Sequence, residues 1–309
     1  MPITHRPTAM TAVIVGSALV LGAGPALAEI PTCEDLPGHD ALTDALVAAV
    51  AEANGGLAND MWATIVDRDG IVCAVTFSGG DRGDQWPGSR VISAQKANTA
   101  NAFSLPPGAG GAFPGLALST ANLWTAAQPG GSTFIDGNAI APFPGGSLFG
   151  LQFSNPVDTA VAYGDDPGDH KGADASDYGT VKDPMVGQII GGVNVFGGGL
   201  ALYEEGEDTL LGAVGVSGDT SCADHNVAWR VRDALNLDFV PAGVGPLGGT
   251  VADNIIFDVV DTGVGNAVSQ SGFGHPECGP GAADDNDAVI AACLPGDGAS
   301  ATCVAANGD

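Results

Sequence analysis

The sequence predicts an α+β protein from two observations. Stretches with helical spacing of apolar residues occur at 40–54, 89–103 and 224–235, and runs rich in β-branched and aromatic residues lie between them. In chain order these elements are a helix, a hairpin, a helix, a long irregular middle, two strands and a helix. The sequence therefore predicts helices packed on a sheet within one fold.

The first helix and the hairpin that follows have the clearest signals. In the stretch 40–54, DALTDALVAAVAEAN, apolar residues recur at helical spacing, and two glycines end it. Two β-rich runs, 61–66 and 71–77, then flank Asp69-Gly70, a strong hairpin-turn signal. Asp67 and Asp69 could also be metal ligands, but the turn explains them more simply.

The second predicted helix, 89–103, presents small residues on one face, suited to close packing. Lys96 and Thr99 lie three positions apart and so share one side of it. The span from about 105 to 183 is rich in Gly, Pro and Asp, which predicts long loops with short helices and strand fragments. Five aspartates and a histidine lie close together in this span: Asp165, Asp166, Asp169, Asp174, Asp177 and His170. A calcium loop is an alternative there, but the spacing of the aspartates does not match an EF-hand.

Regular structure returns after residue 184. A glycine-rich run leads into 200–203, and 209–217 is expected to be a buried strand whose glycines allow close backbone approach. The helix at 224–235 has Asp224 as its expected N-cap. From about 236 we expect an extension with one strand-like stretch at 254–260, and residues 279–309 are expected to be a mobile or disulfide-pinned tail.

The N-terminus has the pattern of a secretory signal. Arg6 lies in a short n-region, Ala12–Gly24 is apolar, and Pro25 precedes a small-x-small cleavage site at Ala26–Ala28. An uncleaved anchor is the alternative, although the apolar run is shorter than the roughly 18 residues of a membrane helix. We expect a signal peptide at 1–28, one domain at 29–278 and the tail at 279–309, and hence a periplasmic or secreted protein with no membrane segment after cleavage.

Charge and cysteine content narrow the range of partners. The chain has 36 acidic and 9 basic residues and a formal charge of −27, which excludes nucleic acid as a partner. A solvated acidic surface explains this charge, and capture of a basic partner is the alternative. The cysteine number is even, which predicts disulfides in an exported protein. The pairing is open among 15 connectivities, although Cys293 and Cys303 could close a local loop.

Four stretches together resemble the GlcG/HbpS family of haem-binding proteins. They are IVDRDGIVCAV, SAQKANTANAF, GGVNVFGGGLALY and LLGAVGVSGDTSCADHNVA, which occur in the family's order. Asn194 replaces the usual proline of the third motif, and the insertion at 105–183, the extension from 236 and the cysteines depart from the short family form. The resemblance implies a profilin-like antiparallel sheet with packed helices, a homo-oligomer, and haem or a related tetrapyrrole as ligand.

The resemblance also implies site residues. Lys96, Thr99 and Phe103 match the family's helix motif; Lys96 could pair with a haem propionate, and Thr99 could supply an oxygen near iron at a subunit interface. His39 and His225 are the candidate iron ligands, with surface histidines as the alternative reading. His275, Glu277 and Cys278 lie close together in sequence as three possible metal ligands, although a disulfide is the favoured use of Cys278.

The sequence predicts no catalytic centre. It lacks a G-x-S-x-G motif, and no carboxylate pair stands out for acid–base chemistry. We therefore expect an exported protein that binds or senses haem without catalysis. The alternatives are an extracytoplasmic enzyme acting on a small organic substrate and an accessory subunit of an extracytoplasmic dehydrogenase.

Overall fold

The computed structural model describes residues 30–128, 148–164, 172–206, 209–244, 252–261, 267–294, 296 and 303. The chain divides into two units, Met1–Ile30 and Pro31–Asp309, and the architecture below is that of the second. The predicted signal peptide lies outside the described residues, as do Asp165, Asp166, Asp169 and His170. Within the described ranges, no helix combines the length and the apolar character needed to cross a bilayer.

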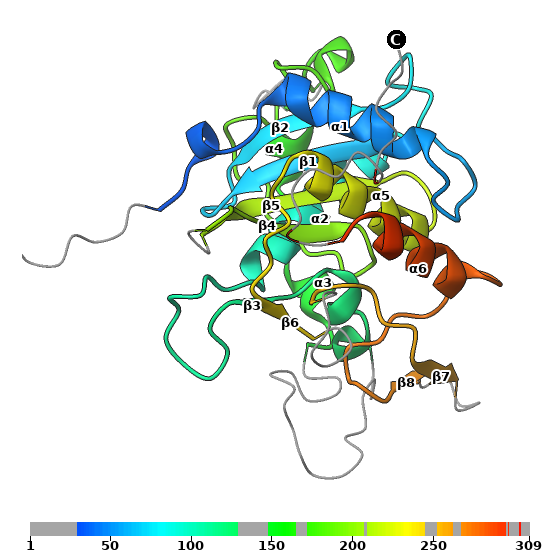
Figure 1. Ribbon diagram of the computed structural model, residues 1–309. Helices are drawn as coiled ribbons and strands as arrows, with labels where there is room; N and C mark the ends of the chain where they lie inside the picture. The colour runs from blue at the N-terminus through cyan, green and yellow to red at the C-terminus, as the bar shows by residue number, and fades with distance from the viewer. Residues whose placement is uncertain are drawn as a thin grey trace, which may run out of the picture. The chain divides into compact units, whose positions relative to one another are not determined.

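A four-stranded antiparallel sheet with the strand order β2-β1-β5-β4 forms the centre of this unit (Figure 1). Its strands are β1 (Trp62–Asp67), β2 (Val72–Phe77), β4 (Gly199–Tyr203) and β5 (Leu210–Ser217). The predicted hairpin is confirmed. The Asp67 carboxylate accepts hydrogen bonds from the backbone N–H groups of Asp69 and Ile71, so this residue shapes the turn.

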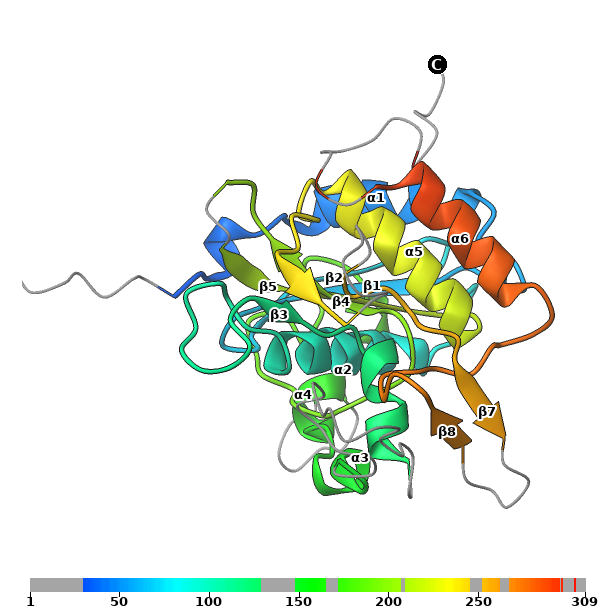
Figure 2. The same cartoon turned by 60° about the horizontal axis from the view of Figure 1, so that its bottom comes forward.

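Three helices cover one face of the sheet: α1 (His39–Ala51), α5 (Ser221–Ala234) and α6 (Ala282–Ala292) (Figure 2). The short helix η1 (Cys33–Asp35) precedes α1. Leucines of α1 and valines of α5 pack on this face in the largest apolar cluster, which includes the fully buried Leu42, Leu46, Val214 and Val227. Burial of this apolar surface is the main stabilising contribution of the layer.

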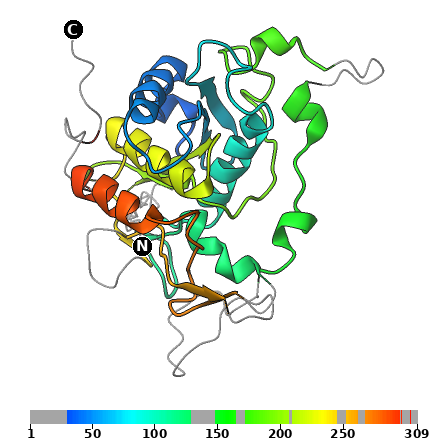
Figure 3. The same ribbon diagram turned by 90° about the vertical axis from the view of Figure 1, so that its right-hand side faces the viewer.

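The helix predicted at 89–103 is confirmed as α2 (Ser89–Ala102), and it covers the opposite face of the sheet (Figure 3). This helix lies directly against the backbone of the sheet. A Cβ added at Gly215 would lie 2.0 Å from the carbonyl oxygen of Ser93, and one at Gly199 would lie 2.5 Å from that of Lys96. The predicted close backbone approach is confirmed, because only glycine at these positions admits the small-residue face of α2.

The described part of the 105–183 span consists of short elements, as predicted, and no helix there exceeds five residues. One of the strand fragments, β3, pairs in parallel with β6 of the C-terminal extension. The elements of the two segments are β3 (Leu116–Ala117), η2 (Ala121–Leu123), η3 (Thr125–Ala127), α3 (Leu151–Ser154), α4 (Thr159–Tyr163), η4 (Ala175–Asp177) and β6 (Ala242–Gly243).

The C-terminal region differs from expectation in three respects. The strand-like stretch at 254–260 is mostly irregular; only its end joins β7 (Val259–Asp261), which pairs with β8 (Ala267–Ser269). The predicted tail instead contains α6, whose Val289 is buried in the main core, because small apolar residues suffice for packing on α5. The N-cap of α5 is Thr220, not Asp224; its side chain accepts the hydrogen bond from Ala223 N–H.

All six cysteines form disulfides, which confirms the prediction of disulfide bonding. Cys293–Cys303 closes the expected local loop across a separation of 10 residues. Cys33–Cys73 joins the segment before α1 to β2, and Cys222–Cys278 joins the start of α5 to the C-terminal extension. The extension is therefore bound covalently to the domain.

Candidate functional site

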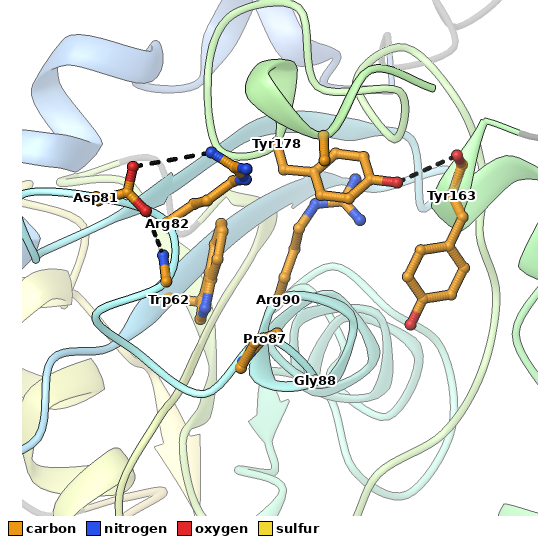
Figure 4. Close-up of a pocket in the computed structure, with 10 residues that line it drawn as sticks. Trp62, Asp81, Arg82, Pro87, Gly88, Arg90, Tyr163 and Tyr178 are labelled. Carbon is orange, nitrogen blue, oxygen red and sulfur yellow. Dashed lines mark hydrogen bonds and ion pairs between the residues drawn. The ribbon is translucent and has the colours of Figure 1, made fainter. Parts of the chain in front are cut away.

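A pocket of about 320 Å³ lies at the N-terminal end of α2 (Figure 4). Its walls come from β1, the loop before α2, and the 105–183 insertion, so segments far apart in sequence build it. The lining residues that matter for its chemistry are Trp62, Arg82, Pro87, Arg90, Tyr163 and Tyr178. The pocket thus combines aromatic rings with two of the chain's few basic residues.

Arg90 fixes the inner wall of the pocket. Its guanidinium donates two hydrogen bonds to the Asp183 carboxylate, one of them at 2.7 Å from Nε, and a third to the carbonyl oxygen of Ala162 at 2.8 Å. Both side chains of the ion pair are almost fully buried. Asp183 also accepts from the N–H groups of Gly179 and Met185. The pair therefore ties the insertion to the first turn of α2.

Tyr178 forms the aromatic part of this wall. The Arg90 guanidinium carbon lies 4.1 Å from the centroid of its ring, a cation–π contact, and its hydroxyl donates to the Tyr163 carbonyl oxygen at 3.4 Å. The next residue, Gly179, has φ of +76°, and a Cβ there would lie 2.4 Å from the Phe77 ring. Glycine at this position lets the chain pass Phe77 and turn Tyr178 toward the pocket.

The outer rim is the loop between β2 and α2. Asp81 organises it by accepting from the N–H of Gly83 at 2.9 Å, and its carbonyl oxygen accepts from Gln85 at 2.7 Å. The buried Trp62 ring donates its indole N–H to the Trp86 carbonyl oxygen at 3.1 Å, which holds the loop above β1. Arg82 is 43% exposed; its guanidinium lies 3.8 Å from the Asp81 carboxylate, and its charge also reaches the exposed carboxylate of Asp174. Both carboxylates are exposed to solvent, so Arg82 presents positive charge that is only partly neutralised.

Lys96 occupies a different environment in the middle of α2. Its ammonium donates to the Asp224 carboxylate at 2.6 Å and to the Val216 carbonyl oxygen at 3.0 Å, and the residue is 2% exposed. Burial lowers the pKa of Lys96, and the Asp224 carboxylate opposes that shift. Because Asp224 also accepts from the N–H groups of Gly218 and Asp219, the pair joins α2 to the start of α5.

The other residues implied by the resemblance do not converge on one cavity. Thr99 is fully buried; its hydroxyl donates to the Gln95 carbonyl and accepts from the N–H of Asn194. Phe103 follows α2 and packs against the apolar cluster around Leu118 and Leu123.

The two candidate histidines lie on different elements. His39 begins α1, and its Nε2 lies 2.9 Å from the carbonyl oxygen of Gly179, next to Tyr178. His225 is fully buried in α5, where its Nε2 accepts from the N–H of Ile255 at 3.1 Å. Burial lowers the pKa of His225 to about 3, so the ring is neutral near pH 7. Of the two, only His39 contacts the segment that carries Tyr178, through the carbonyl oxygen of Gly179.

Sequence reasoning did not single out Arg90, Trp62, Tyr163 or Tyr178. One signal was present for Arg90, because a cation in the first turn of a helix opposes the helix dipole and suggests a specific partner. That partner, Asp183, lies 93 residues further along the chain, and nothing local identifies it.

Comparisons with solved structures find similar chains at low identity. A PduOC–haem complex is 20% identical over 64% of this chain and 91% of its own, with a TM-score of 0.37. The Klebsiella pneumoniae protein ORFY is 22% identical over 63% of this chain and 88% of its own (TM-score 0.35). A double mutant of Streptomyces reticuli HbpS is 18% identical over 72% of this chain and 99% of its own (TM-score 0.34).

No curated protein matches the chain. The family model described as "Haem degrading protein HbpS-like" matches residues 38–232, which is more than half of the chain and contains all four motifs that carried the resemblance. The protein belongs to the HbpS-like family.

Proposed function

We propose that the protein binds haem or a related tetrapyrrole in the pocket at the start of α2. The observation that carries the proposal is the pairing of aromatic rings with arginine in one pocket of a protein from the HbpS-like family. A porphyrin offers a flat apolar ring and carboxylates at one edge. The pocket offers surfaces of matching chemistry for both.

The apolar part of the fit rests on three aromatic residues. Trp62, Tyr163 and Tyr178 line the pocket, and the two tyrosine rings lie 6.5 Å apart in an edge-to-face arrangement. The volume of about 320 Å³ is near the lower end of the range of roughly 300–1,000 Å³ for ligand pockets. We propose that one edge of the macrocycle enters the pocket and that a second copy of the chain covers the remainder, in a homo-oligomer.

The charged part of the fit depends on Arg82. A formal charge of −27 repels a dicarboxylate such as haem from most of the surface. Arg90 is committed to Asp183, whereas Arg82 is half-exposed and its carboxylate neighbour is 3.8 Å away. We therefore assign propionate binding to Arg82. Lys96, in this assignment, acts by holding Asp224 and the helix rather than by contacting the ligand.

Haem, when bound, would supply an iron centre whose axial ligands in proteins are histidine, cysteine, methionine or tyrosine. Tyr163 and Tyr178 line the pocket, and His39 contacts Gly179, the residue after Tyr178. The Thr99 hydroxyl and His225 lie in the buried interior. Tyrosine at the pocket is therefore the ligand that we propose for iron, with His39 as the alternative imidazole ligand.

We further propose a binding or sensing role without catalysis, in a periplasmic or secreted protein. Three disulfides support an oxidising compartment, since such bonds are rare in reducing ones. The signal-peptide pattern at 1–28 supports the same location.

Absorbance titration with haem tests the proposal. The parent protein is expected to shift the Soret band of added haem. Arg82→Ala is expected to weaken haem binding by about tenfold to hundredfold, because a hydrogen bond to a charged group is typically worth about 1.5–3 kcal/mol. Lys182→Ala is the matched control, since it removes the same charge from an exposed side chain that does not line the pocket.

Failure of the parent protein to bind haem would remove the function. An equal loss of affinity in the two variants would instead show that net charge, not the pocket, governs binding.

A further inference from the structure

The contact between the start of α5 and the C-terminal extension contains three potential metal ligands. The sulfurs of Cys222 and Cys278 and a ring nitrogen of His275 all lie within 4.8 Å of one another. The two sulfurs form a disulfide. Two thiolates and an imidazole are a ligand set that binds Zn²⁺, but a disulfide provides no thiolate.

The ring of His275 is fixed by a hydrogen bond at one of its two nitrogens. Its Nδ1 donates to the carbonyl oxygen of Pro276 at 2.7 Å, which places the lone pair on Nε2. The residue is 1% exposed, and among the described residues its Nε2 has no hydrogen-bond partner. A buried imidazole nitrogen without a partner is costly, so binding of a ligand there would remove that cost.

The loop that carries His275 is fixed from two sides. The N–H of His275 donates to the Ile256 carbonyl oxygen at 2.8 Å, and the Thr125 hydroxyl donates to the Gly274 carbonyl oxygen. The imidazole would therefore keep its position if the disulfide opened.

The first turn of α5 favours thiolates. The Sγ of Cys278 accepts from the backbone N–H of Cys222 at 3.0 Å and lies 3.4 Å from the Ser221 hydroxyl. A helix N-terminus lowers the pKa of a cysteine thiol. Cys278 is exposed whereas Cys222 is buried, so a soluble reductant can reach one end of the bond.

We propose that Cys222, Cys278 and His275 form a zinc site that exists only when the Cys222–Cys278 disulfide is reduced. A dithiol or phosphine reductant supplies two electrons, and two protons are taken up to give two thiols. Zn²⁺ then binds both sulfurs and a ring nitrogen of His275, and the two thiol protons are released. The inference does not depend on haem binding.

The geometry requires only local movement. Zinc bonds of about 2.3 Å to sulfur at a tetrahedral angle separate the two sulfurs by roughly 3.8 Å. The Cα atoms are 6.0 Å apart, so rotation of the two side chains can provide this separation. Three protein ligands leave a fourth position for water, as in zinc sites that remain open.

A second group of two cysteines and one further potential metal ligand differs from the first in that it contains no histidine. Its members are Cys33, Asp67 and Cys73. There the third ligand is the Asp67 carboxylate, which already accepts from the N–H groups of Asp69 and Ile71 in the β1–β2 turn. Reduction of the Cys33–Cys73 disulfide would give two thiols beside a carboxylate that is already hydrogen-bonded. This group therefore serves as the matched control.

The test measures zinc bound by the full chain before and after reduction with a phosphine, which is removed before equilibrium dialysis against Zn²⁺. We expect the oxidised protein to bind no zinc at this site and the reduced protein to bind it. The paired change Cys222→Ser and Cys278→Ser should abolish binding by the reduced protein. The paired change Cys33→Ser and Cys73→Ser should leave it unchanged.

His275→Gln tests the imidazole directly, with thiol number unchanged. Zinc affinity of the reduced variant should fall by more than about tenfold, since loss of even an outer-shell partner costs about 10–100-fold. Unchanged affinity in His275→Gln, or zinc binding retained without Cys222 and Cys278, would overturn the site. Loss of the helical circular dichroism signal when the parent protein is reduced would overturn it as well, because α5 and its contacts must persist.

Discussion

The two buried ion pairs of α2 show how one helix serves two purposes. Arg90 pairs with Asp183, and Lys96 pairs with Asp224; each cation is at most 2% exposed, and the partners lie 93 and 128 residues away. Arg90 lines a pocket, together with the ring of Tyr178. The side chain of Lys96 instead reaches from α2 past the backbone of the sheet to the start of α5.

The chemistry of the two cations explains the difference. A guanidinium is planar, so Arg90 can bind a carboxylate through two N–H groups, a carbonyl through another and an aromatic ring through its face. An ammonium is a compact charge, and that of Lys96 is satisfied by two acceptors in a small buried space. The two buried cations therefore position the chain, and our proposal assigns the charge of the ligand to Arg82 instead.

The largest expected effect comes from breaking the Lys96–Asp224 pair. Lys96→Ala leaves a buried carboxylate without its counter-ion and should lower the free energy of unfolding by about 3–5 kcal/mol, measured by urea denaturation. The control is the double variant with Asp224→Ala, which should lose less than the sum of the two single changes. If the loss is below about 1 kcal/mol and haem binding is weaker, Lys96 contacts the ligand rather than stabilising the fold.

A second, intermediate effect concerns protonation of the buried His225. Burial lowers the pKa of His225 to about 3, from an unfolded value of about 6.5. Between these values the unfolded chain binds the extra proton, so stability falls as the pH is lowered, by up to about 1.4 kcal/mol per pH unit for this histidine. Between about pH 6.5 and 4.5 the loss is therefore about 2–3 kcal/mol.

His225→Gln, which cannot take up that proton, should show a shallower loss of stability over this pH range when urea denaturation is repeated at each pH. The exposed variant Lys182→Ala is the control and should keep the parent's slope. Equal slopes for His225→Gln and the parent protein would show that the ring is protonated in the folded state.

The smallest effect on stability is expected at the pocket. Tyr178→Leu keeps an apolar side chain but removes the ring that faces Arg90, and a cation–π contact is worth about 0.5–2 kcal/mol. Thermal unfolding should therefore change little, whereas haem affinity should fall because part of the aromatic wall is lost. Tyr178→Phe retains the ring and separates stacking from the role of the hydroxyl. If Tyr178→Leu binds haem with the affinity of the parent protein, haem does not bind in this pocket.

Local signals predicted most of the central fold. Asp69-Gly70 predicted the hairpin, and apolar spacing predicted α1 and α2, because turn geometry and helix periodicity depend on neighbouring residues. The glycines of β5 predicted close approach, and Gly215 provides it beneath Ser93. The helix α6 was not predicted, because its small side chains pack against α5 and other segments distant in sequence, partners that the local sequence does not show.

The sequence by itself determined the strand and helix signals, the acidic surface and the four motifs that identify the family. Only the tertiary structure decided the partners: Asp183 for Arg90, Asp224 for Lys96, and Cys278 for Cys222. Helix and turn signals act over a few residues, whereas these pairs join positions 56 to 128 residues apart. Their formation depends on how the sheet brings the two helix layers and the insertion together, which no local pattern encodes.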